Sequence, residues 1–199
     1  MARKVDHEQR KREIAEKAIR LFSQVGYDNV SLIMIAAAAG ISRTVLYRYF
    51  CSKHEVMVAA IQAVTGEIEA RCSRIIADRR RPIEKLEAVC HQVADVMFGR
   101  REFVISVFDF VIGMVRTGVD VNGSIRDFTE GTRRAIQLLV RHAINRGELP
   151  SVLVPERITD AIYAEFESCA MRIVLGTEKT SETAKVRLSD VVRAISSWH

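Results

Sequence analysis

Residues 39–55 read "AGISRTVLYRYFCSKHE" and continue an apolar run, "LIMIAAAA". Apolar residues flank Gly40 at the spacing of two short helices joined by a tight turn. They are Ile35, Ala36 and Ala39 before the glycine, and Ile41, Leu46 and Tyr49 after it. Glycine permits the backbone of such a turn, and the small Ala36 lets the helices approach. We therefore predict a helix-turn-helix.

The second helix of this pair turns a polar and basic face outward, formed by Arg43, Thr44, Tyr47 and Arg48. Arginine pairs bidentately with guanine in the major groove of DNA, and hydroxyl and ammonium groups suit phosphate oxygens. Lys53 begins the following helix, whose positive end favours phosphate. The alternative is a set of packing tyrosines and solvated cations. It stays open for Tyr49 and is disfavoured for Arg43 and Tyr47.

Helical patterns run along the chain, and strand signals are nearly absent. Gly26 is expected to end the first helix. Ser31 and Ser42 are expected to cap the next two, and Ser52 with Glu55 to form a capping box. We predict an all-α protein of about nine helices, at about 6–25, 31–40, 42–50, 52–76, 82–98, 102–117, 124–146, 156–175 and 182–197.

The charge of the chain is uneven. The net charge is +5, and residues 1–60 carry ten Lys/Arg against six Asp/Glu, so most of the excess lies in the first third. A positively charged N-terminal third favours binding to a polyanion such as a nucleic acid. The N-terminal cations either track phosphates or form a solvated helix start; they are Arg3, Lys4, Arg10, Lys11 and Arg12. Residues 79–81, all arginine, are expected to be a solvated linker.

Composition limits the class of protein further. No apolar run reaches the roughly 18 residues of a membrane span, and no apolar stretch follows the charged start. We therefore expect a cytoplasmic protein without a membrane partner. The four cysteines are expected to be reduced core thiols. No phosphate loop, metal motif or catalytic motif occurs, so we predict no enzyme activity, no cofactor and no metal site.

Residues 14–61 resemble the N-terminal DNA-binding domain of the TetR family of bacterial transcriptional regulators. The residues at the family's spacing are Ala18, Phe22, Gly26-Tyr27, Ile35-Ala36, Ala39-Gly40-Ile41-Ser42, Leu46-Tyr47, Phe50 and Ser52-Lys53. The resemblance implies a helix-turn-helix domain at residues 1–54 and a helical ligand-binding and dimerisation domain at residues 55–199. It implies DNA contacts by Ser31, Arg43, Thr44, Tyr47, Tyr49 and Lys53, to which we add Ser42 and Arg48.

Two positions depart from the family's pattern. Ile33 and Met34 replace residues that are commonly polar or charged, so their helix is expected to make fewer phosphate contacts. Thr44 and Val45 replace a commoner small pair, which can alter base preference.

The helix expected at residues 102–117 has a narrow stripe of polar or small residues: Glu102, Ser106, Asp109, Gly113 and Arg116. The other positions of residues 102–116 are apolar, so most of the helix circumference is expected to be buried. Phe103, Phe110 and Met114 are candidate walls of a cavity for a hydrophobic or aromatic effector. Asp109, His91, Glu165 and Cys169 are further ligand candidates, although residues of these types are more often ordinary surface or core residues.

The resemblance also implies assembly and regulation. Family members are usually homodimers that pair through their last two helices, bind a near-palindromic operator in double-stranded DNA, and release it when a small molecule enters the C-terminal domain. We therefore expect a ligand-responsive regulator, most simply a repressor. The alternative is a protein of the same fold that acts through protein partners and does not bind DNA.

Overall fold

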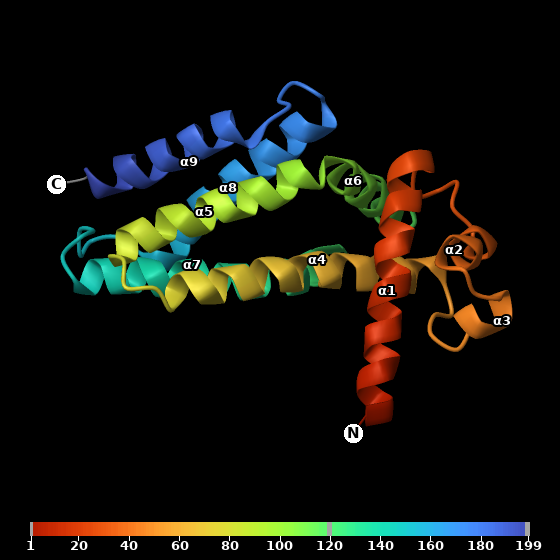
Figure 1. Ribbon diagram of the computed structural model, residues 1–199. Coiled ribbons are helices and arrows are strands. Elements are labelled where there is room, and N and C mark those ends of the chain that lie inside the picture. Colours follow the sequence, from red (N-terminus) through yellow and green to blue (C-terminus); the bar gives the residue numbers. More distant parts are fainter. Residues whose placement is uncertain (1, 119–120, 198–199) are drawn as a thin grey trace. The chain divides into compact units, whose positions relative to one another are not determined.

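The computed structural model describes residues 2–118 and 121–197, with the side chains of residues 7–118 and 127–197. These ranges contain nine helices and no strand, which confirms the predicted all-α class (Figure 1). The helices are α1 (Ala2–Val25), α2 (Leu32–Ala39), α3 (Arg43–Leu46), α4 (Lys53–Ile76), α5 (Pro82–Gly99), α6 (Arg101–Arg116), α7 (Val121–Asn145), α8 (Pro155–Val174) and α9 (Ser181–Ser196). The side chains of Arg3 and Lys4 lie outside the described residues.

The chain forms two compact units. The first comprises Met1–Gly66 and Glu102–Phe128, and the second comprises Glu67–Arg101 and Thr129–His199. The long helices α4 and α7 each contribute to both. The boundary predicted after residue 54 divides the chain by expected function, DNA binding before it and ligand binding after it. It is not the boundary between the packing units, and it stays a prediction.

The first unit is built around α1. This helix packs on α2, which in turn packs on α3. Their apolar faces, together with Phe50 from the segment after α3, form a core of buried side chains that includes Ile14, Ala18, Phe22, Ile35 and Leu46. Gly26 ends α1 in the left-handed conformation, with a φ of 79°, as its position predicted. This small core fixes the orientation of α3.

Helix α6 buries one face only. Phe103, Ser106, Phe110 and Met114 are buried, whereas Ile112 and Val115 are 45% and 59% exposed. The expectation that most of α6 would be buried is therefore wrong for this outer face, because a sequence pattern does not reveal how many neighbours a helix has. The buried Ser106 hydroxyl donates to the Glu102 carbonyl at 3.0 Å, which satisfies a polar group inside the unit.

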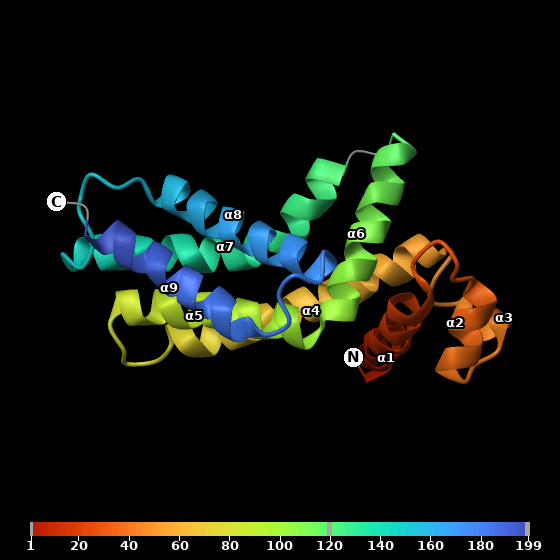
Figure 2. The same ribbon diagram turned by 90° about the horizontal axis from the view of Figure 1, so that it is seen from above.

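The second unit is a helical bundle. Helix α5 lies along α9 and packs against α8, and α8 packs on α9 (Figures 1 and 2). Its core holds the apolar faces of four helices, including Leu86, Val89, Leu139, Ile162, Phe166 and Leu188. Burial of each such side chain contributes about 1.5–3 kcal/mol, so this unit has an ordinary hydrophobic core.

Candidate nucleic-acid interface

The turn between α2 and α3 has the geometry that the sequence predicted. Gly40 adopts a φ of 68° and a ψ of 34°. Its N–H donates to the Ala37 carbonyl at 3.0 Å, and the Ile41 N–H donates to the Ala36 carbonyl at 3.0 Å. These bonds close α2 and reverse the chain within one residue, because glycine tolerates the left-handed backbone.

Serine side chains cap both helices of the motif. The Ser31 hydroxyl accepts the Met34 N–H at 3.3 Å, and the Ser42 hydroxyl accepts the Val45 N–H at 3.2 Å. Both serines are exposed. Because each hydroxyl accepts from the helix, its own proton is left to donate to an acceptor such as a phosphate oxygen.

The capping box predicted at Ser52 and Glu55 is formed in part. Ser52 accepts the Glu55 N–H at 3.2 Å, but the Glu55 carboxylate accepts the Cys51 N–H at 2.8 Å. The carboxylate thus reaches one residue further back than a capping box requires. The turn that leads into α4 is held from both sides.

Helix α3 presents Arg43, Thr44, Tyr47 and Arg48 to solvent, while Leu46 is fully buried. Regular helix ends at Leu46, earlier than predicted, although hydrogen bonds of the turn type continue to Phe50. The Arg43 guanidinium donates to the Tyr47 hydroxyl at 3.1 Å and lies 5.3 Å from the centroid of its ring. Two predicted contacts therefore form one exposed pair.

Tyr49 is half-buried and has an aromatic partner. Its ring centroid lies 4.8 Å from that of His7 on α1. The packing interpretation of Tyr49 thus has a specific contact, and among the described residues its hydroxyl makes no hydrogen bond that would prevent a phosphate contact. Sequence reasoning did not find His7, because the helix was expected to begin only about there.

Lys53 is engaged within the first unit. Its ammonium donates to the carbonyls of Tyr27 and Asp28, each at 2.9 Å, and lies 4.5 Å from the Tyr27 ring centroid. Burial, with a smaller effect of the Asp28 carboxylate, raises the pKa of Tyr27 above its ordinary value. Lys53 therefore ties the start of α4 to the turn after α1, and one ammonium proton is left for a phosphate.

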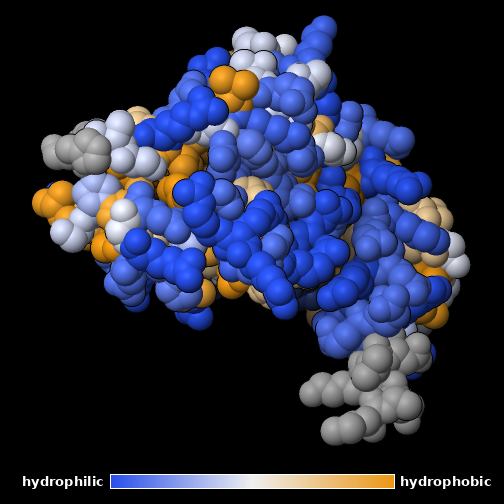
Figure 3. Space-filling model, turned by 60° about the vertical axis from the view of Figure 1, so that its left-hand side comes forward, coloured by the Kyte–Doolittle hydropathy of each residue, from blue (hydrophilic) through white to orange (hydrophobic). Residues whose placement is uncertain are grey.

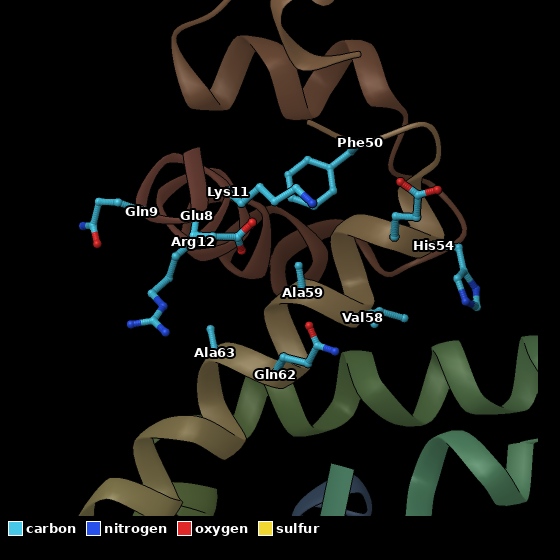
Figure 4. Close-up of a pocket in the computed structure, with 11 residues that line it drawn as sticks. Glu8, Gln9, Lys11, Arg12, Phe50, His54, Val58, Ala59, Gln62 and Ala63 are labelled. Carbon is cyan, nitrogen blue, oxygen red and sulfur yellow. The ribbon is translucent and has the colours of Figure 1, made fainter. Parts of the chain in front are cut away.

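A groove of about 940 Å³ lies between α1 and α4 in the first unit (Figure 4). Figure 4 shows the Lys11 side chain extending beside Phe50, and its ammonium lies 5.8 Å from that ring centroid. Arg10 is paired with Glu13 at 2.7 Å. In Figure 4 the Arg12 side chain points away from Lys11 and Phe50. Of the described N-terminal cations, Arg12 is therefore the one left without an internal partner.

The ligand candidates of the first unit are divided between core and surface. Phe103, Phe110 and Met114 are buried. The Phe110 ring lies 5.0 Å from the rings of both Tyr27 and His54. Asp109 is exposed. Phe110 thus fills a small aromatic cluster that holds α6 against the turn after α1 and the start of α4.

The ligand candidates of the second unit make polar contacts with other side chains of that unit. The His91 Nε2 lies 2.8 Å from the Ser189 hydroxyl. Arg187 donates to Glu165 at 2.6 Å and to Glu178 at 2.8 Å, and it lies 3.5 Å from the Cys169 sulfur. Hydrogen bonding to Glu178, the largest cause, raises the pKa of Arg187. Burial raises the pKa of the Cys169 thiol.

Three of the hollows on the described part of the molecule have volumes of about 940, 420 and 450 Å³, and none of these three is lined by the seven ligand candidates. Within the described ranges, no helix has the length and apolarity that a membrane crossing needs. No group of three or more His, Cys, Asp or Glu side chains in the same ranges is arranged to hold a metal ion.

Known proteins share this sequence and fold. Residues 14–60 match the family model described as "Bacterial regulatory proteins, tetR family". The chain is 24% identical over 191 residues to an uncharacterized HTH-type transcriptional regulator of Mycobacterium tuberculosis, covering 92% of this chain and 86% of that one. It is 31% identical over 86 residues to the HTH-type transcriptional regulator HbdR of an Aromatoleum species, covering 43% of this chain and 36% of HbdR.

A solved structure extends the likeness to both units. The transcriptional regulator FadR from Bacillus subtilis, in complex with stearoyl-CoA, is similar with a TM-score of 0.78 at 17% identity, covering 94% of this chain and 98% of FadR. These related proteins are transcriptional regulators rather than enzymes. The family match covers the stretch in which the serine caps, the Gly40 turn and the exposed face of α3 were found. Residues 14–60 therefore form a helix-turn-helix domain of the TetR family of bacterial regulatory proteins, and the whole chain is similar to transcriptional regulators.

Proposed function

We propose that the protein is a homodimeric repressor that binds a near-palindromic operator and releases it when a small molecule binds. The observation that carries the proposal is the exposed Arg43–Tyr47 pair on a helix whose position is fixed by the Gly40 turn and the Ser42 cap. An arginine near the start of such a helix can read guanine, while hydroxyls and Arg48 contact the backbone. We assign DNA binding to residues 1–54 and effector binding and dimerisation to residues 55–199.

The proposed dimer interface lies on α8 and α9. Their buried faces are used within the protomer, but Met171, Leu175 and Val186 are 46%, 66% and 59% exposed. Ala161 and Ala164 are exposed small residues of α8, and they extend the exposed surface of Met171 and Leu175 toward the start of that helix. Pairing of two copies would bury these side chains and set two recognition helices about 34–36 Å apart, or near a multiple of that spacing.

The proposed effector is hydrophobic or aromatic. The apolar outer face of α6, with Ile112 and Val115 exposed, supports this chemistry. FadR, which shares the fold, binds stearoyl-CoA, so long-chain acyl thioesters belong among the first compounds to test. Because an operator-binding protein acts on chromosomal DNA, we also propose that it works in the cytoplasm.

The test is selection of random duplex DNA on the purified full-length protein, followed by sequencing. The proposal expects a palindromic site whose preference Arg43→Ala relaxes at one base position in each half. Arg20→Ala serves as the matched control, because Arg20 is an exposed arginine of α1 with no assigned role. Failure of a folded dimer to enrich any sequence, with or without candidate effectors, would support a protein that acts through other proteins.

A further inference from the structure

The second unit has a basic hollow where the turn between α4 and α5 meets the end of α7. Its volume is about 420 Å³. It is lined by Asp78, Arg79, Arg80, Pro82, Lys85, His142, Asn145 and Arg146. Four cations against one carboxylate leave the lining with a net charge of +3 when His142 is neutral. Figure 3 brings this side of Figure 1 forward, and hydrophilic side chains cover most of that face.

The carboxylates around the hollow are already committed. Asp78 accepts the backbone N–H of Arg79 at 2.5 Å and the Arg80 Nε–H at 2.8 Å. The contact with Arg80 is the main reason that the pKa of Asp78 lies below its ordinary value. Glu148 accepts the Ile83 N–H at 2.9 Å. The first N–H of α5, that of Ile83, is thus occupied, and no spare carboxylate in the lining neutralises the remaining cations.

Two guanidinium groups of the lining have no partner among the described residues. Within the described residues, the side chains of Arg79 and Arg146 make no hydrogen bond or ion pair, and both are exposed. Lys85 differs, because its ammonium donates to the Ile76 carbonyl at 2.8 Å and closes the end of α4. Gathering like charges is unfavourable unless an anion joins them. The hollow therefore has an excess of positive charge that a bound anion would neutralise.

We propose that this hollow binds the phosphate groups of a small phosphorylated molecule, with Arg79 and Arg146 as the two clamps and the Asn145 amide as a further donor. Guanidinium groups match phosphate oxygens in bidentate geometry. Ligand sites of small molecules have volumes of about 300–1,000 Å³, which includes this hollow. A concave site with cations from two separate segments favours a small ligand over duplex DNA, which binds along open basic surfaces. The proposal does not depend on the operator or on the hydrophobic effector.

Isothermal titration of the full-length protein with inorganic pyrophosphate tests the proposal. The double variant Arg79→Gln/Arg146→Gln removes both clamps. The matched control is Arg20→Gln/Arg116→Gln, which makes the same change of charge at two exposed arginines outside the hollow. We expect the control to keep the wild-type Kd and the double variant to bind about tenfold more weakly or worse. Circular dichroism melting confirms that each variant is folded.

Other outcomes would overturn the assignment. Equal weakening in the control would show a nonspecific effect of charge, and absence of binding to the wild type at millimolar pyrophosphate would remove the site. Dependence of duplex DNA binding, but not pyrophosphate binding, on Arg79 and Arg146 would assign the surface to DNA instead. Titrations with ATP and coenzyme A distinguish the sources of phosphate: the one that binds more tightly than pyrophosphate, and loses that affinity in the double variant, identifies the ligand class.

Discussion

The Arg43 guanidinium donates a hydrogen bond to the Tyr47 hydroxyl one turn further along the chain, at 3.1 Å, and lies 5.3 Å from its ring centroid. The contact restricts a long side chain before any DNA is bound. Less conformational entropy is then lost when the guanidinium meets a base. Tyr47 can therefore strengthen base recognition by Arg43 without contacting a base itself.

This relationship separates the effects of two substitutions on operator binding. Arg43→Ala is expected to cost about 1–3 kcal/mol and to lose discrimination at one base position. Tyr47→Phe keeps the ring but removes the hydroxyl, so it should weaken binding only a few-fold and preserve sequence preference. Fluorescence anisotropy with the selected operator and with single-base variants measures both. Equal loss of preference in the two variants would contradict this division of roles.

The cap of α3 predicts a coupled loss of stability and binding. Ser42→Ala removes the acceptor of the Val45 N–H and is expected to lower the free energy of unfolding by about 1 kcal/mol. DNA affinity should fall as well, because α3 has only one regular turn and depends on its cap. Ser73→Ala is the matched control, since Ser73 is exposed on α4 and the change should stay within about 0.5 kcal/mol. Urea denaturation measures stability, and an unchanged midpoint in Ser42→Ala would refute the cap's contribution.

The expectation that all four cysteines are core thiols is wrong for Cys51, which is exposed, whereas Cys72, Cys90 and Cys169 are buried. Burial raises the pKa of Cys72 to about 11 and that of Cys90 to about 12, so these thiols are both shielded and protonated at neutral pH. A thiol-specific chromogenic reagent should therefore modify one cysteine quickly in the native protein and the other three only on unfolding. Cys51→Ser should abolish the fast phase, and a fast phase that persists would contradict the burial of the others.

The parts of this molecule that sequence predicts well are those decided locally. The Gly40 turn and the caps by Ser31 and Ser42 each depend on residues within four positions, so the residue types indicate the structure directly. Lys53 was predicted only as a phosphate contact, because its carbonyl partners lie 25 and 26 residues away. The exposed outer face of α6 escaped prediction for the same reason, since burial depends on neighbours that periodicity cannot identify.

The basic hollow shows this limit most clearly. The sequence presents residues 79–81 as a short basic run, and the expectation of a solvated linker followed from composition alone. Arg146 lies more than sixty positions further along, and nothing in its local sequence connects it with Arg79. Only the folded second unit places both side chains around one cavity.

The contacts of Glu67 predict a loss of stability in acid. Its carboxylate accepts hydrogen bonds from Arg71 at 2.6 Å and from Arg100 at 2.7 Å. Burial raises the pKa of Glu67, but the hydrogen bonds and charges of the two arginines outweigh it, so the pKa lies below its ordinary value. A carboxyl group whose pKa is lowered by folding stabilises the protein above its unfolded pKa, and that contribution is lost as the pH falls through the folded value.

We therefore expect wild type to be more stable than Glu67→Gln at pH 7 and the difference to shrink progressively below about pH 4.3, the ordinary pKa of a glutamate. Urea denaturation of both proteins across this range measures the difference, and comparing them isolates Glu67 from the other carboxylates. Glu167→Gln is the matched control, because Glu167 is exposed on α8 with no hydrogen bond or ion pair among the described residues. Its difference from wild type should stay nearly constant. If the Glu67→Gln difference also stayed constant into strong acid, the two arginine contacts would not be stabilising the folded protein.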